Sequence, residues 1–273
     1  MKIIRADPAG FCFGVQRAYE LARNFRGKKI QTLGELIHNP EVLEELNACG
    51  VRAVSAISKI RTGVVIIRAH GISEKKMCEL KKKKVKVVDA SCPFVKKIHA
   101  EIKKFTSKKI PILVIGQRRH PEMQAVIEDF PEVEVIQKIS EKRLQKFTGK
   151  KVALLSQTTE QAEKFERVLK ILKKLKVHVT PKDTICSATR ERQAAAASLA
   201  KKVDLMIVIG GRRSNNTRQL FEIVRQIRSA FLIENKNEIQ KKWFTKIHTV
   251  GVTAGASTPE KVIAQVCEKL KNL

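Results

Sequence analysis

The sequence is poor in the aromatic residues that stack on nucleic-acid bases, and it lacks long apolar segments. One Trp and one Tyr occur among 273 residues. No apolar run reaches the roughly 18 residues that a membrane-spanning helix needs. The first ten residues, MKIIRADPAG, show no apolar stretch followed by a small-residue cleavage site, as a secretory signal would. We therefore expect a cytoplasmic protein that does not cross a membrane.

Several common site motifs are also missing. No G-x-G-x-x-G opens a helix, and no G-K-[ST] phosphate loop occurs. The sequence also contains no closely spaced C-x-x-C pair of the kind that binds structural zinc. We therefore expect neither a bound nucleotide nor NAD(P), and a structural zinc site is disfavoured.

Acidic residues are scarce relative to basic ones. The chain has 55 Lys and Arg against 27 Asp and Glu, a formal net charge of +28. Such a charge attracts anionic partners, which include nucleic acids, acidic proteins and phosphorylated substrates. The lysines are spread over predicted helices, as in 96–109 and 169–179, and do not form a tail. Solvated helix faces therefore explain the charge better than nucleic-acid binding, which is kept as an alternative function.

Short apolar runs alternate with amphipathic stretches along the whole chain. Runs typical of buried strands occupy 64–67, 112–115, 152–155 and 206–210. Stretches typical of helices occupy 40–49, 121–130 and 217–230. This alternation predicts an α/β fold with mainly parallel sheets.

Six predicted strand-to-helix junctions are rich in small and polar residues. They are 33–40, 67–73, 115–122, 155–160, 209–217 and 252–260. Pro40, Pro121 and Pro259 stand where the first residue of each following helix is expected, a position that proline favours.

Three cysteines also recur after predicted strands at similar intervals along the sequence. Cys12, Cys92 and Cys186 come in turns after predicted strands, and the last two end an Asp-x-x-Cys sequence. Their spacing predicts three α/β units of about 80–95 residues. The units are 13–91, 92–186, and 1–12 together with 187–273. Cys49, Cys78 and Cys267 lie in predicted helices and are expected to pack in the interior.

Ligands of open α/β sheets bind at the carboxyl ends of the strands. Three such units around a pseudo-threefold axis would direct those ends at one cavity that holds the three thiols. Polar residues near helix N-termini, where anions bind, would line it. These are His38, His70, His120, Thr158, Ser214, Asn216 and Ser257. The set suits a phosphate or diphosphate, and three thiolates without a fourth suggest an iron–sulfur cluster with one open iron.

Several segments together resemble the motifs of the LytB/IspH family of diphosphate reductases. They are GFCFGV, LGELIHNP, RAHG, DASCPFV, RHPE, SQTT, GGRRSNNTRQL and TAGASTPE. The resemblance runs from Cys12 to Pro259, which is nearly the whole chain. It implies a trefoil of three α/β domains around a central [4Fe-4S] cluster with one open iron.

The resemblance also implies roles for individual residues. Cys12, Cys92 and Cys186 match the cluster ligands, and Glu122 matches the acid that delivers protons. Thr158 matches the threonine near the substrate hydroxyl, and His120 is assigned to both catalysis and binding. The residues matching the diphosphate site are His38, His70, His120, Ser214, Asn216 and Ser257. Asn215 is a departure, because many members have a second serine there; its amide can still donate to phosphate.

The implied reaction is the reductive dehydroxylation of 4-hydroxy-3-methylbut-2-enyl diphosphate to isopentenyl and dimethylallyl diphosphate. The implied electron donor is a flavodoxin or a ferredoxin, and a monomer is expected. An alternative enzyme with three cysteine ligands is a hydro-lyase with an open-iron cluster, which would turn over without a reductant.

Overall fold

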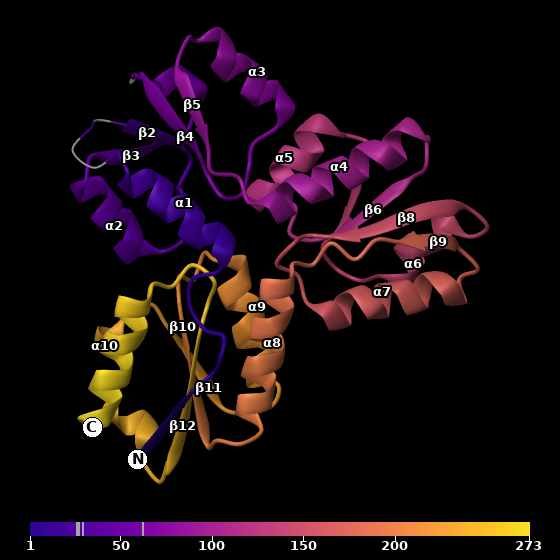
Figure 1. Ribbon diagram of the computed structural model, residues 1–273. Coiled ribbons are helices and arrows are strands. Elements are labelled where there is room, and N and C mark those ends of the chain that lie inside the picture. The colour runs from indigo at the N-terminus through magenta and orange to yellow at the C-terminus, as the bar shows by residue number, and fades with distance from the viewer. Residues whose placement is uncertain (26–27, 29, 62) are drawn as a thin grey trace. The chain divides into compact units, whose positions relative to one another are not determined.

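The computed structural model describes residues 1–25, 28, 30–61 and 63–273 (Figure 1). Its contacts group the chain into two compact units, each of which is described by itself. The first unit comprises Met1–Lys28, Glu35–Arg52 and Ser187–Leu273, and the second comprises Lys29–Gly34 and Ala53–Cys186. No helix in the described residues is both long and apolar enough to cross a membrane.

The first unit is built on one parallel sheet of four strands. Their spatial order is β1 (Lys2–Arg5), β12 (Thr249–Ala254), β10 (Leu205–Ile209) and β11 (Ala230–Ile233). The helices of this unit are α1 (Phe13–Arg23), α2 (Pro40–Ala48), α8 (Ser187–Ala200), α9 (Asn215–Arg225) and α10 (Glu260–Lys271). Short 3-10 turns occupy Lys236–Glu238 and Lys241–Phe244.

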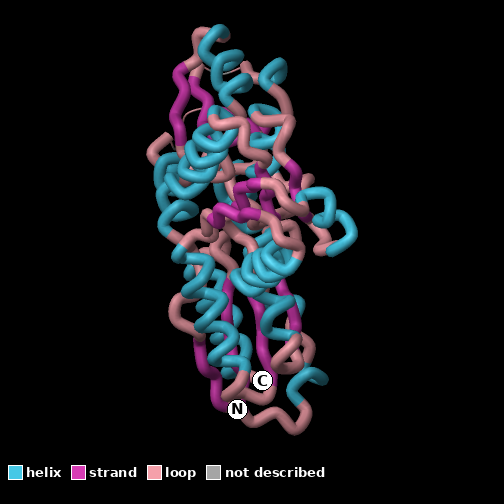
Figure 2. Tube along the Cα trace, turned by 90° about the vertical axis from the view of Figure 1, so that its right-hand side faces the viewer, coloured by secondary structure: helices cyan, strands magenta, loops and turns pink. Residues whose placement is uncertain are grey.

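Helices cover both faces of this sheet, which explains its continuous apolar strands. On one face, Val262, Ile263 and Val266 of α10 pack on Ile207 and Val252. On the other face, α8 and α9 lie against the strands (Figure 1), and their Leu199 and Leu220 pack with Met206 and Val208 of β10. Both termini lie at the same end of this sheet (Figures 1 and 2).

Two further four-stranded sheets follow. One has the order β3 (Val51–Val54), β2 (Ile30–Leu33), β4 (Val64–Ile67) and β5 (Lys86–Asp89). The other has the order β7 (Glu134–Ile136), β6 (Ile112–Ile115), β8 (Lys151–Ser156) and β9 (His178–Pro181). Every strand pairing described in these sheets is parallel.

The helices of the second unit again use apolar faces against the strands. They are α3 (Glu74–Lys82), α4 (Pro93–Ser107), α5 (Pro121–Asp129), α6 (Glu141–Leu144) and α7 (Ala162–Lys174), with 3-10 turns at Ile57–Lys59 and Gln145–Phe147. The helices α4 and α5 pack on one face of the sheet that contains β6 and β8, and α7 packs on the other.

All three sheets share one strand order. The second place is taken by β2, by β6 and, in the sheet of the first unit, by β10, and the neighbouring third place is taken by β4, β8 and β12. The fourth place is taken by β5, by β9 and, in the sheet of the first unit, by the amino-terminal strand β1. The predicted α/β class with parallel sheets is confirmed, and each of the six predicted junctions runs from a strand into a helix.

Some predicted boundaries are wrong. The helix expected at 217–230 is α9, Asn215–Arg225, because Ala230 already pairs with Met206 as the start of β11. Pro259 is the N-cap of α10 instead of its first residue, whereas Pro40 and Pro121 do begin their helices. Cys78 is exposed on α3 and does not pack in the interior.

Candidate functional site

The three cysteines that follow the fourth strand of each sheet occupy equivalent positions. Cys12 and Cys92 are the N-caps of α1 and α4, and Cys186 immediately precedes α8. The two N-cap side chains make no capping hydrogen bond. A helix N-terminus favours negative charge, and the thiolate is the form of cysteine that binds metals.

A backbone hydrogen bond repeats at all three cysteines. The N–H of Cys12 donates to the Ala256 carbonyl at 3.2 Å, and that of Cys92 donates to Ala69 at 2.9 Å. The N–H of Cys186 donates to the Thr158 carbonyl at 3.1 Å. Each acceptor lies in the loop after the third strand of the same sheet. The three sheets therefore present one sulfur each in the same local geometry, and the donor set fits an iron–sulfur cluster.

No disulfide joins any of the six cysteines, all of which lie within the described residues. Cys12, Cys92 and Cys186 are each half-buried, so their sulfurs are neither in the core nor fully exposed. Cys49 and Cys267 have the same intermediate burial, so the repeated loop position, and not the exposure, distinguishes the three candidate ligands.

In the second unit, two predicted site residues lie at the junction of the loop after β6 with α5, His120 in the loop and Glu122 in the first turn of the helix. His120 is the N-cap of α5, and its Nδ1 accepts from the Glu122 N–H at 3.2 Å. Because Nδ1 accepts, the proton of the neutral ring is assigned to Nε2, which is left as a donor. The rings of His70 and His120 meet edge to face with centroids 5.1 Å apart.

The Glu122 carboxylate is buried against Thr158. It is 1% exposed, and its two oxygens accept from the Thr158 N–H at 2.9 Å and the Thr158 hydroxyl at 2.7 Å. Burial raises the pKa of Glu122 to about 7, although the two hydrogen bonds from Thr158 oppose this shift. A carboxyl group with this pKa can hold and release a proton near neutral pH.

Thr158 links this acid to a predicted cluster ligand. Its N–H and hydroxyl bond Glu122, and its carbonyl accepts from Cys186. In the second unit, Thr158 of the β8–α7 loop therefore contacts both the carboxylate of Glu122 and the backbone of Cys186.

In the first unit, His38 is held by an acidic neighbour. Its Nδ1 lies 3.0 Å from Glu35 Oε2, and Arg213 Nη1 donates to the other oxygen at 2.5 Å. Burial alone would raise the pKa of Glu35, but the hydrogen bonds with His38 and Arg213 outweigh it and lower the pKa. The ionised Glu35 therefore fixes the orientation of the His38 ring. The Ser257 hydroxyl donates to the His38 carbonyl at 3.2 Å.

The start of α9 also forms an anion-binding geometry. Ser214 is its N-cap, and Ser214, Asn215 and Asn216 are 5%, 2% and 4% exposed. Asn216 Oδ1 accepts from the Ala256 N–H at 2.8 Å, whereas its buried Nδ2 has no hydrogen-bond partner among the described residues. A buried donor without a partner at a helix N-terminus is a suitable contact for a phosphate oxygen.

Two residues that support the site were not predicted from the sequence. Arg192, 5% exposed, donates from Nε to the Gly10 carbonyl at 3.1 Å and from Nη2 to the Phe11 carbonyl at 2.9 Å. It thereby fixes the loop that carries Cys12. Glu35, which orients His38, is the second. Neither residue stands out by sequence, because their roles depend on tertiary contacts.

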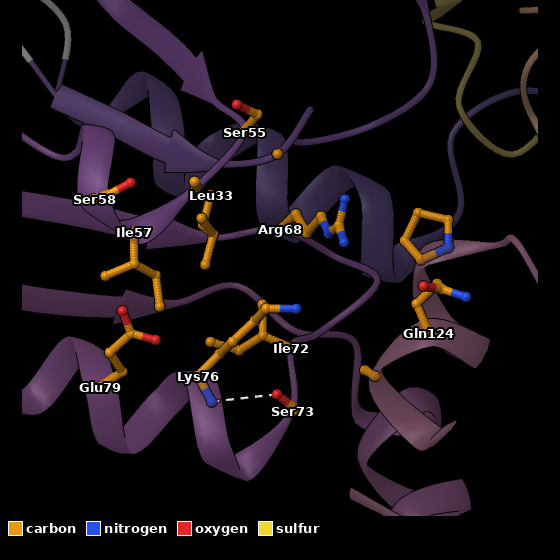
Figure 3. Close-up of a pocket in the computed structure, with 14 residues that line it drawn as sticks. Leu33, Ser55, Ile57, Ser58, Arg68, Ile72, Ser73, Lys76, Glu79 and Gln124 are labelled. Atoms are coloured by element: carbon orange, nitrogen blue, oxygen red, sulfur yellow. Dashed lines mark hydrogen bonds between the residues drawn. The ribbon is translucent and has the colours of Figure 1, made fainter. Parts of the chain in front are cut away.

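A separate cavity of about 300 Å³ lies beside the first turn of α5 (Figure 3). Arg68 extends into it, and Leu33, Ile72 and Gln124 are among its walls. Its lining includes none of the predicted site residues, so it is distinct from the groups described above.

Comparison with known proteins gives consistent matches over the full length. The family model described as LytB protein matches residues 3–271. A Campylobacter hominis relative named 4-hydroxy-3-methylbut-2-enyl diphosphate reductase is 42% identical over 277 residues and covers 100% of both chains. A relative of the same name from Trichlorobacter lovleyi is 40% identical and covers 99% of this chain and 98% of its own.

Comparison with solved structures also finds diphosphate reductases. A structure of (E)-4-hydroxy-3-methyl-but-2-enyl diphosphate reductase, described as the terminal enzyme of the non-mevalonate pathway, matches 100% of both chains. Its TM-score is 0.70 at 36% identity. The E-1-hydroxy-2-methyl-but-2-enyl-4-diphosphate reductase from Plasmodium falciparum has a TM-score of 0.90 at 26% identity, over 100% of this chain and 87% of its own. The sequence motifs, the three parallel sheets and these matches lead to one conclusion: the chain belongs to the LytB family.

Proposed function

We propose that this chain reduces (E)-4-hydroxy-3-methylbut-2-enyl diphosphate to isopentenyl and dimethylallyl diphosphate, the last step of the non-mevalonate isoprenoid pathway. The names of its full-length relatives and of both solved structures support this reaction. They favour a reductase over the hydro-lyase and nucleic-acid-binding alternatives.

The observation that carries the proposal is the contact chain from Glu122 through Thr158 to Cys186. In it, Thr158 contacts both a buried acid with a pKa of about 7 and the backbone of a cysteine whose loop position repeats in all three sheets. Reductive removal of a hydroxyl group needs protons and electrons together. Glu122 would supply a proton, and a cluster held by Cys186 and the other two cysteines would supply the electrons.

Cys12, Cys92 and Cys186 would hold a [4Fe-4S] cluster with one open iron, which supplies two electrons per turnover and Lewis acidity. Membership of the LytB family implies an iron–sulfur cofactor. The repeated N–H to carbonyl bond, which fixes each cysteine to its neighbouring loop, supports this ligand set.

Glu122 and the diphosphate of the substrate each deliver one proton. Two electrons and two protons convert the alcohol to the dehydroxylated allylic or alkenyl diphosphate and water, with cleavage of one C–O bond and formation of one C–H bond. Protonated Glu122 passes a proton through the Thr158 hydroxyl, 2.7 Å away, to the departing oxygen. The second proton, which ends on carbon, comes from the diphosphate of the substrate. Thr158 therefore contacts the reacting oxygen, and Glu122 is the proton reservoir.

Donors at helix N-termini bind the diphosphate. The buried Asn216 Nδ2, the Ser214 hydroxyl and the start of α9 supply such donors in the first unit, and Asn215 is the first residue of that helix. Ser257, His38, His70 and the Nε2 of His120 complete the set. Fixed donors of this kind stabilise the negative charge without reorganising during the reaction.

The proposed reaction is tested with anaerobically purified protein, the hydroxylated diphosphate and reduced methyl viologen. We expect both five-carbon diphosphates to form, and the dye to lose two electrons per product. Turnover that continues without a reductant would instead identify a hydro-lyase. Absence of turnover in protein with a complete cluster would contradict the proposal.

Replacing His38 with alanine is expected to weaken substrate binding. The variant loses one charge-assisted contact to diphosphate, so KM should rise about tenfold or more. The kcat value should change less than KM, because the acid Glu122 is retained. Steady-state kinetics measure both values, and unchanged KM and kcat would remove His38 from the site.

A further inference from the structure

Phe13 is an unusually exposed aromatic residue. Three large apolar side chains among the described residues are exposed: Met1, Phe13 and Leu273. Two of them are the chain ends, whereas Phe13 is internal and 66% exposed. It is also the residue that directly follows Cys12, at the start of α1.

The backbone that carries Phe13 is held by hydrogen bonds from two other parts of the first unit. Arg192, buried in α8, donates to the carbonyls of Gly10 and Phe11, and the Cys12 N–H donates to Ala256. Gly10 has φ of +86°, a backbone conformation that glycine adopts readily and other residues rarely do.

The two phenylalanines that flank Cys12 differ sharply in environment. Phe11 packs edge to face on Tyr19, with ring centroids 5.5 Å apart, whereas Phe13 projects into solvent. The hydrogen bonds to Gly10, Phe11 and Cys12 hold the loop from which this ring projects. An exposed aromatic ring on such a supported backbone is the type of residue that dominates the free energy of protein–protein interfaces.

The proposed reaction needs an electron donor that approaches the cluster near Cys12. Each turnover consumes two electrons, and the sequence has no nucleotide-binding motif to supply them. A protein carrier must therefore bring its redox group close to the cluster. Phe13 is one residue from a proposed cluster ligand and is open to solvent, so a carrier docked on it would be near Cys12.

Charge complementarity identifies the kind of partner. The chain has a net charge of +28, and Arg17 follows Phe13 by one turn of α1. Such a field steers acidic proteins toward the molecule, while an apolar contact fixes their orientation.

We propose that Phe13 is the anchor on which an acidic one-electron carrier of the flavodoxin or ferredoxin kind docks to deliver electrons beside Cys12. This inference rests on the proposed reductase function. It assigns the docking position to the amino-terminal end of α1 and the dominant contact to a single ring.

The test compares Phe13→Ala with the parent holoenzyme in two assays. With a reduced acidic flavodoxin or ferredoxin as donor, the KM for the carrier should rise about tenfold or more, as loss of an interfacial aromatic anchor predicts. With reduced methyl viologen, kcat should stay within about twofold of the parent value, because a small dye needs no docking surface. Calorimetric titration with the oxidised carrier should show the same increase in Kd, independently of turnover.

Two further variants sharpen the result. Phe13→Leu keeps an apolar side chain and should recover most of the carrier affinity. Leu273→Ala removes another exposed apolar residue and should leave the KM for the carrier unchanged. An unaltered carrier KM and Kd in Phe13→Ala would overturn the proposal. A parallel fall of the viologen-driven rate would also overturn it, because it would show that Phe13 supports the cluster instead of the partner. If neither protein is active with viologen, the reductase function itself fails, and the calorimetric titration still decides the docking.

Discussion

Replacing Glu122 with glutamine is expected to lower kcat by a factor of about 10²–10⁴, the usual contribution of a positioned proton donor. The amide has nearly the same shape and still accepts from the Thr158 N–H, so cluster content and substrate affinity should persist. Anaerobic kinetics with reduced methyl viologen measure the loss. An unchanged kcat would refute the role of Glu122 as the proton source.

The pH profile gives an independent check on the same residue. The donor must be protonated, so kcat of the parent enzyme should fall as pH rises through about 7, the pKa of buried Glu122. This limb should be absent in Glu122→Gln. Because folding raises this pKa from 4.5, the folded chain binds the proton more tightly than the unfolded chain. The contribution of Glu122 to the free energy of unfolding therefore decreases from pH 4.5 to about 7.

Glu160 provides a matched control. It is a fully buried glutamate of the same unit, and it pairs with Lys164 at 3.1 Å instead of with Thr158. Glu160→Gln should change thermal stability while kcat keeps its parent pH profile. A similar loss of kcat in both variants would point to a general effect of removing buried carboxylates.

Replacing Cys92 with serine is expected to prevent assembly of a complete cluster and to abolish turnover. A serine hydroxyl remains protonated near neutral pH and does not replace a thiolate ligand. The N–H to Ala69 bond comes from the backbone, so the fold of the loop should be retained. Iron and sulfide analysis and visible absorption after anaerobic reconstitution measure the outcome. Cys78→Ser, at an exposed position on α3, is the control and should load normally. A fully active Cys92→Ser enzyme would exclude Cys92 as a ligand.

Much of the fold could be predicted because strands and junctions leave local signals. Apolar runs at 64–67 and 112–115 coincide with β4 and β6, and Pro40 and Pro121 begin their helices. The end of α9 could not be predicted, since the amphipathic pattern continues past Arg225 and pairing with β10 decides where β11 starts.

The candidate site was also only partly predictable from the sequence. The candidate residues lie in loops after strands, which the sequence marks with small and polar residues. Their partners are far away along the chain: Glu122 and Thr158 are 36 residues apart, and Arg192 lies 182 residues from Gly10. Such contacts, and the pKa that burial gives Glu122, follow from tertiary packing and leave no local pattern.

The pairing of β1 with β12 sets an order of events during biosynthesis. Strand β1 completes its sheet by pairing with β12, which is synthesised much later than β1, since Lys2 pairs with Thr249. Domains that fold during translation generally do so from the amino terminus, but the loop of Cys12 must wait for Ala256, its hydrogen-bond acceptor. A chain truncated before β12 would therefore expose Cys12 without the support of Ala256.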